Sequence, residues 1–386
     1  MNRLNFNVIK GAFILSLFLC STASYTQDDS LTWDGLNRYY RVHVPASYSP
    51  TAATSLIIAI HGGFGSGPLL ETQSQLSVKS DQEGFIVVYP DGVRNTLGIR
   101  TWNAGGCCGS SVANNVDDVG FINTLIDSIV AKYAIDGDKI YLTGMSNGAF
   151  MSYRLACELS ETIAAIAPVS GTMNVKDCNS IRNVPIIHFH SYLDESVPHL
   201  GGTGYGISSH HNPPLDSVLT AWKGKNNCIN QDTIQNDTDL LHIKWSSCQC
   251  NSNIQLYLTH DGGHSWHGGQ KTGLGDATST VVNANDKMWD FFNANPKCSI
   301  SSVQQTKNKI IVSPNPFTSN LNISVNQTNF GSQFILYNSL GVSKTEGTLS
   351  SQKGIQQINT KNLQGGLYFL TVQTVTGLLT IKVVKH

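Results

Sequence analysis

The chain has 386 residues, of which 40% are hydrophobic and 13% are charged, so it is long and apolar enough to form one large domain and one small one. Its net charge is −1, and no basic cluster is interleaved with aromatic residues. This composition argues against a disordered protein and against a nucleic-acid partner.

The first residues have the pattern of a secretory signal peptide. Two basic residues precede the apolar run GAFILSLFLC, and the small residues STAS follow it. We therefore assign residues 1–24 to a signal peptide that is cleaved near Ala23 or Ser24. The run is too short to span a bilayer, so no transmembrane segment is expected. The alternative is a lipoprotein anchor at Cys20, but the residue before it is a leucine instead of the small residue usually required.

Export changes how the remaining cysteines are interpreted. Without Cys20 they number eight, and an even number in an oxidising compartment predicts disulfides. Zinc sites need clusters with CxxC-type spacing, and none occurs. A bridge between adjacent cysteines would be strained. The sequence predicts only these neighbourhoods: Cys228 with Cys248 or Cys250, and Cys107 or Cys108 with Cys157 or Cys178.

The middle of the chain alternates short apolar runs with helical stretches. The runs are typical of strands buried on both faces and occupy residues 55–61, 85–90, 139–144, 163–171, 184–190 and 254–260. Helical periodicity marks residues 118–133 and 149–159. The upstream stretch RYYRVHVP would add an edge strand. The sequence thus predicts a doubly wound, mostly parallel α/β sheet.

One serine lies between two glycines in GMSNGAF, directly after the third predicted strand and before a predicted helix. A GxSxG match alone arises by chance in a glycine-rich chain, but this setting predicts a nucleophile elbow with Ser146 as the nucleophile. The alternative is a serine that caps the helix, which would not require both glycines.

An acid and then a histidine follow in the chain order that this class of hydrolase requires. Asp194 comes after the strand 184–190, and His264 comes after the strand 254–260. Each could be an ordinary loop residue, but three coincidences at three strand ends predict a triad. After the first buried strand, the glycines of HGGFGSG would let backbone N–H groups stabilise an oxyanion beside the N–H of Asn147.

A metal site competes for the same histidines. His260, His264 and His267 are spaced four and three residues apart, and His188 with His190 adds a pair. Two glycines interrupt the first group, and a strand would direct such positions into the core. We therefore expect no metal and no cofactor.

Four blocks resemble the polyhydroxybutyrate depolymerase and feruloyl esterase group of carbohydrate esterase family 1, which are secreted α/β hydrolases. The match runs from about Tyr39 to Trp289 through LIIAIHGGFGSG, TWNAGGCCGSSVANNVDDVGFI, LTGMSNGAFMSYRLACELSETIAAIAPVSGT and LTHDGGHSWHGG. The chain departs from the family at HSYLD, residues 190–194, where HGTxD is common, but it keeps the acid and the following Pro198.

The resemblance implies a role for each matching residue. It implies the following assignments: Ser146, Asp194 and His264 as the triad, Gly63 and Asn147 as the oxyanion hole, and Trp102, Trp266 and Phe64 as substrate-binding residues at the cleft.

After Pro296 the character of the sequence changes. Residues 296–309 form a polar linker, and short alternating strands from Ile310 onward predict a small β-sandwich. Its PNP, YNSLG and GLYFLTV pieces resemble the C-terminal sorting domain of the type IX secretion pathway. The resemblance implies that residues 310–386 engage that machinery and that the protein is secreted or displayed on the cell surface. The alternative is a carbohydrate-binding module.

Together these patterns predict a secreted serine esterase, residues 31–295, that works through an acyl-enzyme. The resemblance implies feruloyl or acetyl esters on plant polysaccharide as substrates. The alternatives are an extracellular polyhydroxyalkanoate depolymerase and a non-catalytic surface protein that binds polysaccharide. The sequence does not separate these esters, because specificity depends on pocket shape and on loops such as residues 201–214.

Overall fold

The computed structural model describes residues 23–205, 210–273, 275–298, 311–324, 331–349, 355–374 and 377–386. Most of the predicted signal peptide and most of the predicted linker lie outside these ranges. Backbone contacts divide the chain into a first unit that ends at Cys298 and a second that begins at Ser299. Each unit is described by itself.

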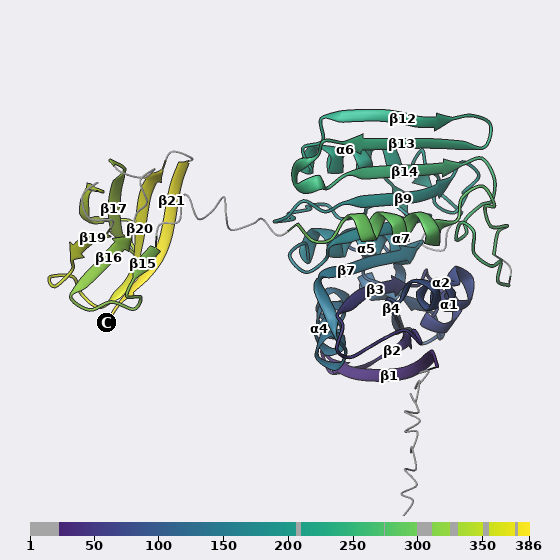
Figure 1. The fold of residues 1–386 in the computed structure, drawn as a ribbon, viewed down its shortest axis with the longest axis horizontal. Helices are drawn as coiled ribbons and strands as arrows, with labels where there is room; N and C mark the ends of the chain where they lie inside the picture. The colour runs from purple at the N-terminus through teal and green to yellow at the C-terminus, as the bar shows by residue number, and fades with distance from the viewer. Residues whose placement is uncertain are drawn as a thin grey trace, which may run out of the picture. The chain divides into compact units, whose positions relative to one another are not determined.

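The first unit is built around one ten-stranded sheet (Figure 1). In sheet order the strands are β1 (Tyr25–Trp33), β2 (Leu36–Val44), β4 (Ile86–Pro90), β3 (Thr54–Ile60), β7 (Ile135–Met145), β8 (Ala165–Val169), β9 (Ile186–Ser191), β14 (Ile254–Thr259), β13 (Leu240–Ser246) and β12 (Asn230–Asn236). The strands from β4 to β14 run parallel, and the flanking strands on both sides run antiparallel. Two short hairpins lie outside this sheet: β5 (Val93–Arg94) with β6 (Arg100–Thr101), and β10 (Gly202–Thr203) with β11 (His211–Asn212).

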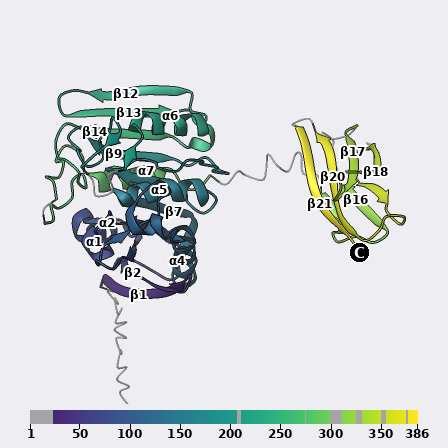
Figure 2. The ribbon, with the colours of Figure 1, turned by 180° about the vertical axis from the view of Figure 1, so that it is seen from behind.

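Helices cover both faces of the sheet. One core holds α4 (Asp118–Lys132), α5 (Asn147–Glu158) and α6 (Leu215–Lys225), and the other holds α1 (Gly67–Ser74), α2 (Leu76–Glu83) and α7 (Ala284–Ala294). Accordingly, α7 crosses in front of the sheet in Figure 1, and α5 lies in front of it in Figure 2. Two short helices, α3 (Gly109–Ala113) and η1 (Gln249–Asn251), lie in loops.

Strand β3 shows why the central strands are continuous apolar runs. Leu56, Ile58 and Ile60 belong to the core of α4 and α5, whereas Ile57 and Ala59 belong to the core of α1 and α2. Successive side chains of a strand point to opposite faces, so a strand covered on both faces needs apolar residues at every position.

The six predicted buried strands and both predicted helices are present. The prediction that RYYRVHVP forms an edge strand is wrong, because β1 pairs with β2 along its whole length, from Tyr25 opposite Val44 to Trp33 opposite Leu36. The sequence did not predict β1, β12 or β13. Every side chain of β12 is exposed, so its sequence lacks the apolar alternation that marks a strand.

The eight cysteines of the described chain form four disulfides: Cys107–Cys108, Cys157–Cys178, Cys228–Cys248 and Cys250–Cys298. The predicted pairing of Cys228 is confirmed. The prediction that Cys107 or Cys108 pairs with Cys157 or Cys178 is wrong. The end of α5 and the loop after β8 bring Cys157 and Cys178 together, with Cα atoms 5.0 Å apart, and the two adjacent cysteines pair with each other.

The second unit is a small β-sandwich. One sheet contains β15 (Ile311–Ser313), β16 (Asn320–Ser324) and β19 (Ile355–Asn359), and the other contains β18 (Ser343–Thr348), β17 (Gln333–Asn338), β20 (Gly366–Thr374) and β21 (Gly377–Lys385). Both sheets contribute to one core, with Leu321 and Ile358 from the first and Leu336 and Leu370 from the second. No helix in the described residues of either unit has the length and apolar character needed to cross a membrane.

Candidate active site

Ser146 forms the turn between β7, which ends at Met145, and α5, which begins at Asn147. Its backbone has φ 55° and ψ −121°, a conformation that costs a non-glycine residue about 1–3 kcal/mol. Gly148 permits this turn, because a Cβ at that position would overlap the carbonyl oxygen of Ile60. The serine side chain makes no capping hydrogen bond, which rules out the alternative of a helix cap.

Asp194 and His264 come from the loops after β9 and β14, which are neighbouring parallel strands. Asp194 Oδ2 lies 2.9 Å from His264 Nδ1. The other carboxylate oxygen accepts the backbone N–H groups of Ser196 at 3.0 Å and Val197 at 2.8 Å. The backbone N–H of His264 donates to Asp276 at 2.7 Å. The pair is therefore fixed from both sides.

The electrostatics of this pair suit proton transfer. Burial acts to raise the pKa of Asp194, but the charge and hydrogen bond of His264 outweigh it and lower that pKa below 3.8. Burial likewise acts to lower the pKa of His264, but the charge and hydrogen bond of Asp194 outweigh it and raise that pKa above 6.5. Asp194 is thus a carboxylate that stabilises a protonated His264, which a general base requires.

Ser146 and His264 line one cavity of about 340 Å³. Within the described part of the chain no hydrogen bond joins the two side chains, and such bonds commonly tighten only when substrate binds. Gly63 and Asn147 line the same cavity, and neither backbone N–H has an acceptor among the described residues. The cavity therefore brings together the predicted triad and two unpaired N–H donors.

Trp102 does not contact this cavity, and the prediction that it binds substrate is wrong. Its side chain is fully buried. The indole N–H donates to His61 O at 2.9 Å, and the Asn147 amide clamps the Trp102 backbone, accepting from N at 2.7 Å and donating to O at 3.1 Å. Trp102 instead holds the loop after β3, which carries Gly63, against the start of α5.

The prediction that Trp266 binds substrate is also wrong. Only 1% of its surface is exposed, and its indole N–H donates to Asn285 Oδ1 at 3.0 Å. Asn285 donates in turn to Ser74 O at 2.7 Å, so Trp266 fastens the His264 loop to α7 and α1. Phe64 differs from both tryptophans, because it is 49% exposed and lines the cavity.

Sequence reasoning missed most of the cavity wall. The apolar part comes from Leu69 on α1, Met145 on β7 and Phe150 on α5, and the loop 201–214 adds Tyr205. Phe150 follows Ser146 by four residues, so helical periodicity could have placed it on the same face of α5. Met145 lies within the GMSNG motif itself, whereas Leu69 and Tyr205 belong to no motif.

A buried chain of hydrogen bonds passes through His190, the first residue of HSYLD, which this chain shares with the HGTxD pattern. His190 Nε2 lies 2.7 Å from Val197 O, His190 Nδ1 lies 3.2 Å from His188 Nε2, and His188 Nδ1 lies 2.9 Å from Tyr153 Oη. Burial lowers the pKa of both histidines, which favours their neutral forms. Since Val197 O can only accept, each neutral ring donates from Nε2 and accepts at Nδ1. The chain thereby holds Val197, whose N–H binds Asp194.

The described residues contain no group of three or more His, Cys, Asp or Glu side chains that could hold a metal ion. The histidines considered as ligands have other neighbours. His267 Nε2 lies 3.0 Å from His190 O, and His260 stacks on Tyr192 with ring centroids 4.1 Å apart.

The strand order, the elbow after β7 and the acid–histidine pair at later strand ends define an α/β hydrolase with a serine-hydrolase fold. Residues 40–197 match the family model Esterase PHB depolymerase, and residues 311–386 match the model Secretion system C-terminal sorting domain. The first unit is thus similar to the Esterase PHB depolymerase family over residues 40–197, and the match to the sorting domain indicates a secreted or cell-surface protein.

Relatives include Feruloyl esterase B from Piromyces equi, which is 28% identical over 58% of this chain and 42% of its own length. The bifunctional acetylxylan esterase/xylanase XynS20E from Neocallimastix patriciarum is 29% identical over 44% of this chain and 23% of its own length. The chain therefore spans less than half of either curated relative. Among solved structures, an acetyl xylan esterase from Aspergillus awamori aligns with a TM-score of 0.49 and 18% identity, over 69% of this chain and 99% of that one.

Proposed function

We propose that the first unit is a serine esterase with Ser146 as nucleophile, His264 as general base and acid, and Asp194 as the residue that orients the imidazole. One observation carries this proposal. The strained elbow serine, the histidine of the 2.9 Å Asp194–His264 pair and two unpaired N–H groups lie on one cavity.

In the proposed reaction Ser146 Oγ attacks the ester carbonyl while His264 takes the hydroxyl proton. Because Nδ1 is bound to Asp194, Nε2 is the nitrogen that accepts this proton. The carbonyl oxygen gains negative charge and receives the N–H groups of Gly63 and Asn147, the latter at the positive end of α5.

His264 then gives the proton to the alkoxide, so the alcohol leaves and the acyl group stays on Ser146. Water enters, His264 removes one of its protons, and the resulting attack releases the acid and restores the serine hydroxyl.

The shape and lining of the cavity support an aromatic acyl group. Its volume of about 340 Å³ is more than an acetyl group needs, and Phe64, Leu69, Met145 and Phe150 give it an apolar wall. The similarity to a protein named feruloyl esterase agrees with this reading. We therefore propose feruloyl esters on plant polysaccharide as the substrates, reached after export by the type IX secretion machinery.

A substrate panel tests this proposal: methyl ferulate, an acetylated xylan and hydroxybutyrate oligomers, each assayed with the whole chain and with Ser146→Ala. We expect the highest kcat/KM on methyl ferulate and loss of all turnover in the variant. Phe64→Ala should raise KM for methyl ferulate, whereas Val78→Ala, an exposed apolar position outside the cavity, should not. Preference for acetyl esters or hydroxybutyrate oligomers would overturn the substrate assignment, and full activity of Ser146→Ala would overturn the mechanism.

A further inference from the structure

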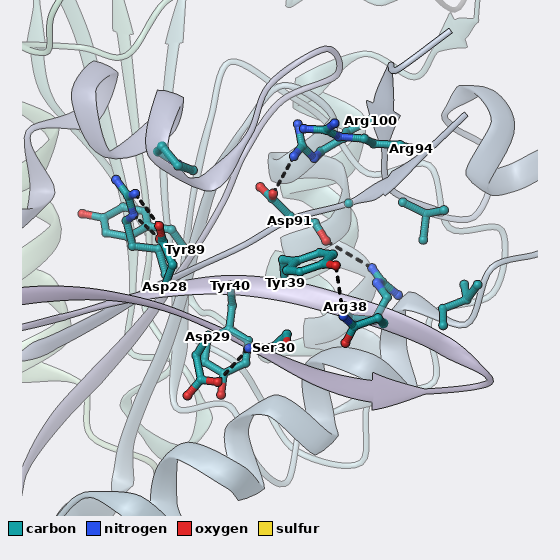
Figure 3. A pocket seen from close by; sticks show the side chains of 16 residues that line it. Asp28, Asp29, Ser30, Arg38, Tyr39, Tyr40, Tyr89, Asp91, Arg94 and Arg100 are labelled. Atoms are coloured by element: carbon teal, nitrogen blue, oxygen red, sulfur yellow. Dashed lines mark hydrogen bonds and ion pairs between the residues drawn. The ribbon is translucent and has the colours of Figure 1, made fainter. Parts of the chain in front are cut away.

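A second cavity of about 700 Å³ lies in the first unit, and Figure 3 shows the side chains that line it. It is lined by residues of β1 and β2, by the end of β4 and by the β5–β6 hairpin. The walls of the two cavities adjoin. Phe64, which lines the first, donates its backbone N–H to Arg100 O at 3.0 Å, and Arg100 lines the second.

All the carboxylates that line this second cavity are paired with cations. The pairs are Asp28 with Arg41 at 2.6 Å, Asp29 with Lys132 at 3.3 Å, and Asp91 with Arg100 at 2.8 Å. Arg38, which also lines the cavity, is paired at 2.7 Å with the buried Asp118. The acids of the cavity are therefore already neutralised by the protein.

Arg94 differs from the other arginines of this cavity, because it has no acidic partner among the residues that the structure describes. It lines the cavity, and within the described ranges no carboxylate lies in ion-pair distance of it. The β5–β6 hairpin places Arg94 directly opposite Arg100, and Figure 3 shows the two side chains next to each other, with Asp91 bound to Arg100. Like charges at opposite strand positions destabilise a pair, and Asp91 compensates only one of these two. An anion at Arg94 would remove this repulsion.

An aromatic face lies in the same cavity. Tyr39 is 57% exposed, its backbone oxygen accepts the N–H of Asp91 at 2.9 Å, and its hydroxyl accepts from Asn37 at 3.0 Å. The ring is therefore fixed while its surface remains accessible. The C–H face of a pyranose can pack on such a ring, its hydroxyls can bond to the amide and charged groups nearby, and a guanidinium holds a carboxylate with two parallel hydrogen bonds.

We propose that this second cavity binds a uronic acid unit of a polysaccharide, with its ring on Tyr39 and its carboxylate on Arg94. The role of the cavity in catalysis rests on the proposed function: a polymer held there would present a neighbouring ester to Ser146. Binding of the acidic sugar does not depend on that function.

Calorimetric titration tests the binding. The whole chain with Ser146→Ala is titrated with a xylo-oligosaccharide that carries a glucuronic acid substituent, and with the same oligosaccharide lacking it. We expect the acidic ligand to bind about tenfold more tightly at low salt, as one charge-assisted contact allows, and the difference to shrink as salt increases. Adding Arg94→Ala should bring both ligands to the same affinity. Adding Lys287→Ala, which removes an exposed positive charge outside both cavities, should change neither.

Equal affinity of the two oligosaccharides, or tight binding of the acidic one after Arg94→Ala, would overturn the assignment. So would displacement of the acidic oligosaccharide by free ferulate, which would identify the carboxylate as that of a reaction product. In the active chain, Arg94→Ala should raise KM about tenfold on a uronate-bearing esterified polymer and leave kcat unchanged. Its kcat/KM on methyl ferulate should also stay the same. Failure of the unmodified chain to hydrolyse methyl ferulate would refute the proposed function while leaving the binding result intact.

Discussion

Acidification from pH 7.5 to pH 5.0 should destabilise the first unit, because His188, His190, His61 and His267 are all buried and held neutral, and the magnitude is worked from the last two. Burial lowers the pKa of His61 and of His267 from 6.5 to about 4. His61 Nδ1 lies 2.6 Å from Gly62 O and Nε2 accepts the N–H of Gly92 at 3.0 Å, so a second ring proton would break that bond. His267 Nδ1 is buried and has no partner in the described chain, so a proton there would find no acceptor.

The magnitude follows from proton linkage. The folded pKa of each histidine lies below its unfolded value, so the stability it contributes is present above pH 6.5 and is lost as the pH falls toward 4. Between pH 7.5 and 5.0 this amounts to roughly 2 kcal/mol per histidine, or about 4 kcal/mol for the two. His264 acts in the opposite direction, because its pKa is raised: its contribution is present below 6.5 and is lost at higher pH, which offsets part of the loss.

Urea unfolding followed by tryptophan fluorescence measures this difference, since all six tryptophans lie in the first unit. His267→Gln should reduce the change in unfolding free energy between the two pH values by roughly 2 kcal/mol. The control is His260→Gln, which removes an exposed histidine. An unfolding free energy that stays within about 1 kcal/mol over this range, or equal effects of the two variants, would refute the reasoning.

Three further outcomes are expected. Asp194→Asn should lower kcat/KM on methyl ferulate by about 10³–10⁴. The acidic limb of its pH–rate profile should move to lower pH, because the charge that raises the pKa of His264 is lost. An unchanged pH–rate profile would contradict the pairing of Asp194 with His264. A chain that ends at Ser299 should keep its kcat/KM on methyl ferulate within a few-fold of the whole chain. A chain that ends at Lys297 lacks the Cys250–Cys298 bridge and should lose about 2–4 kcal/mol of stability. Equal melting temperatures of the two shortened chains would argue against that bridge. Thiol titration of the denatured, unreduced chain after signal cleavage should find less than about one free thiol, and a larger number would contradict the four disulfides.

The parts predicted from the sequence are those where local pattern determines local structure. A strand covered on both faces must be largely apolar, so β3 and β4 were evident from their residues alone. In a parallel sheet the carboxyl ends of neighbouring strands meet at one edge, so Asp194 and His264 could be brought together without knowledge of any contact.

The parts that failed depend on three-dimensional packing. A tryptophan beside a catalytic motif has the same sequence signal whether it faces the cleft or the core, and Trp102 and Trp266 both face the core. Cysteine spacing does not report which loops return to the same place, so Cys157 and Cys178 were wrongly expected to pair with Cys107 or Cys108 instead of with each other. The second cavity is lined by residues of β1 and of the β5–β6 hairpin, and neither element carries a motif.

The central claim is that Ser146 is the nucleophile, and covalent trapping tests it most directly. The whole chain is treated with a fluorophosphonate, digested and analysed by mass spectrometry, beside Ser146→Ala and His264→Ala variants. We expect one adduct per chain, located on Ser146, absent from Ser146→Ala and formed far more slowly in His264→Ala. An adduct on another residue, or equal labelling of Ser146→Ala, would contradict the account.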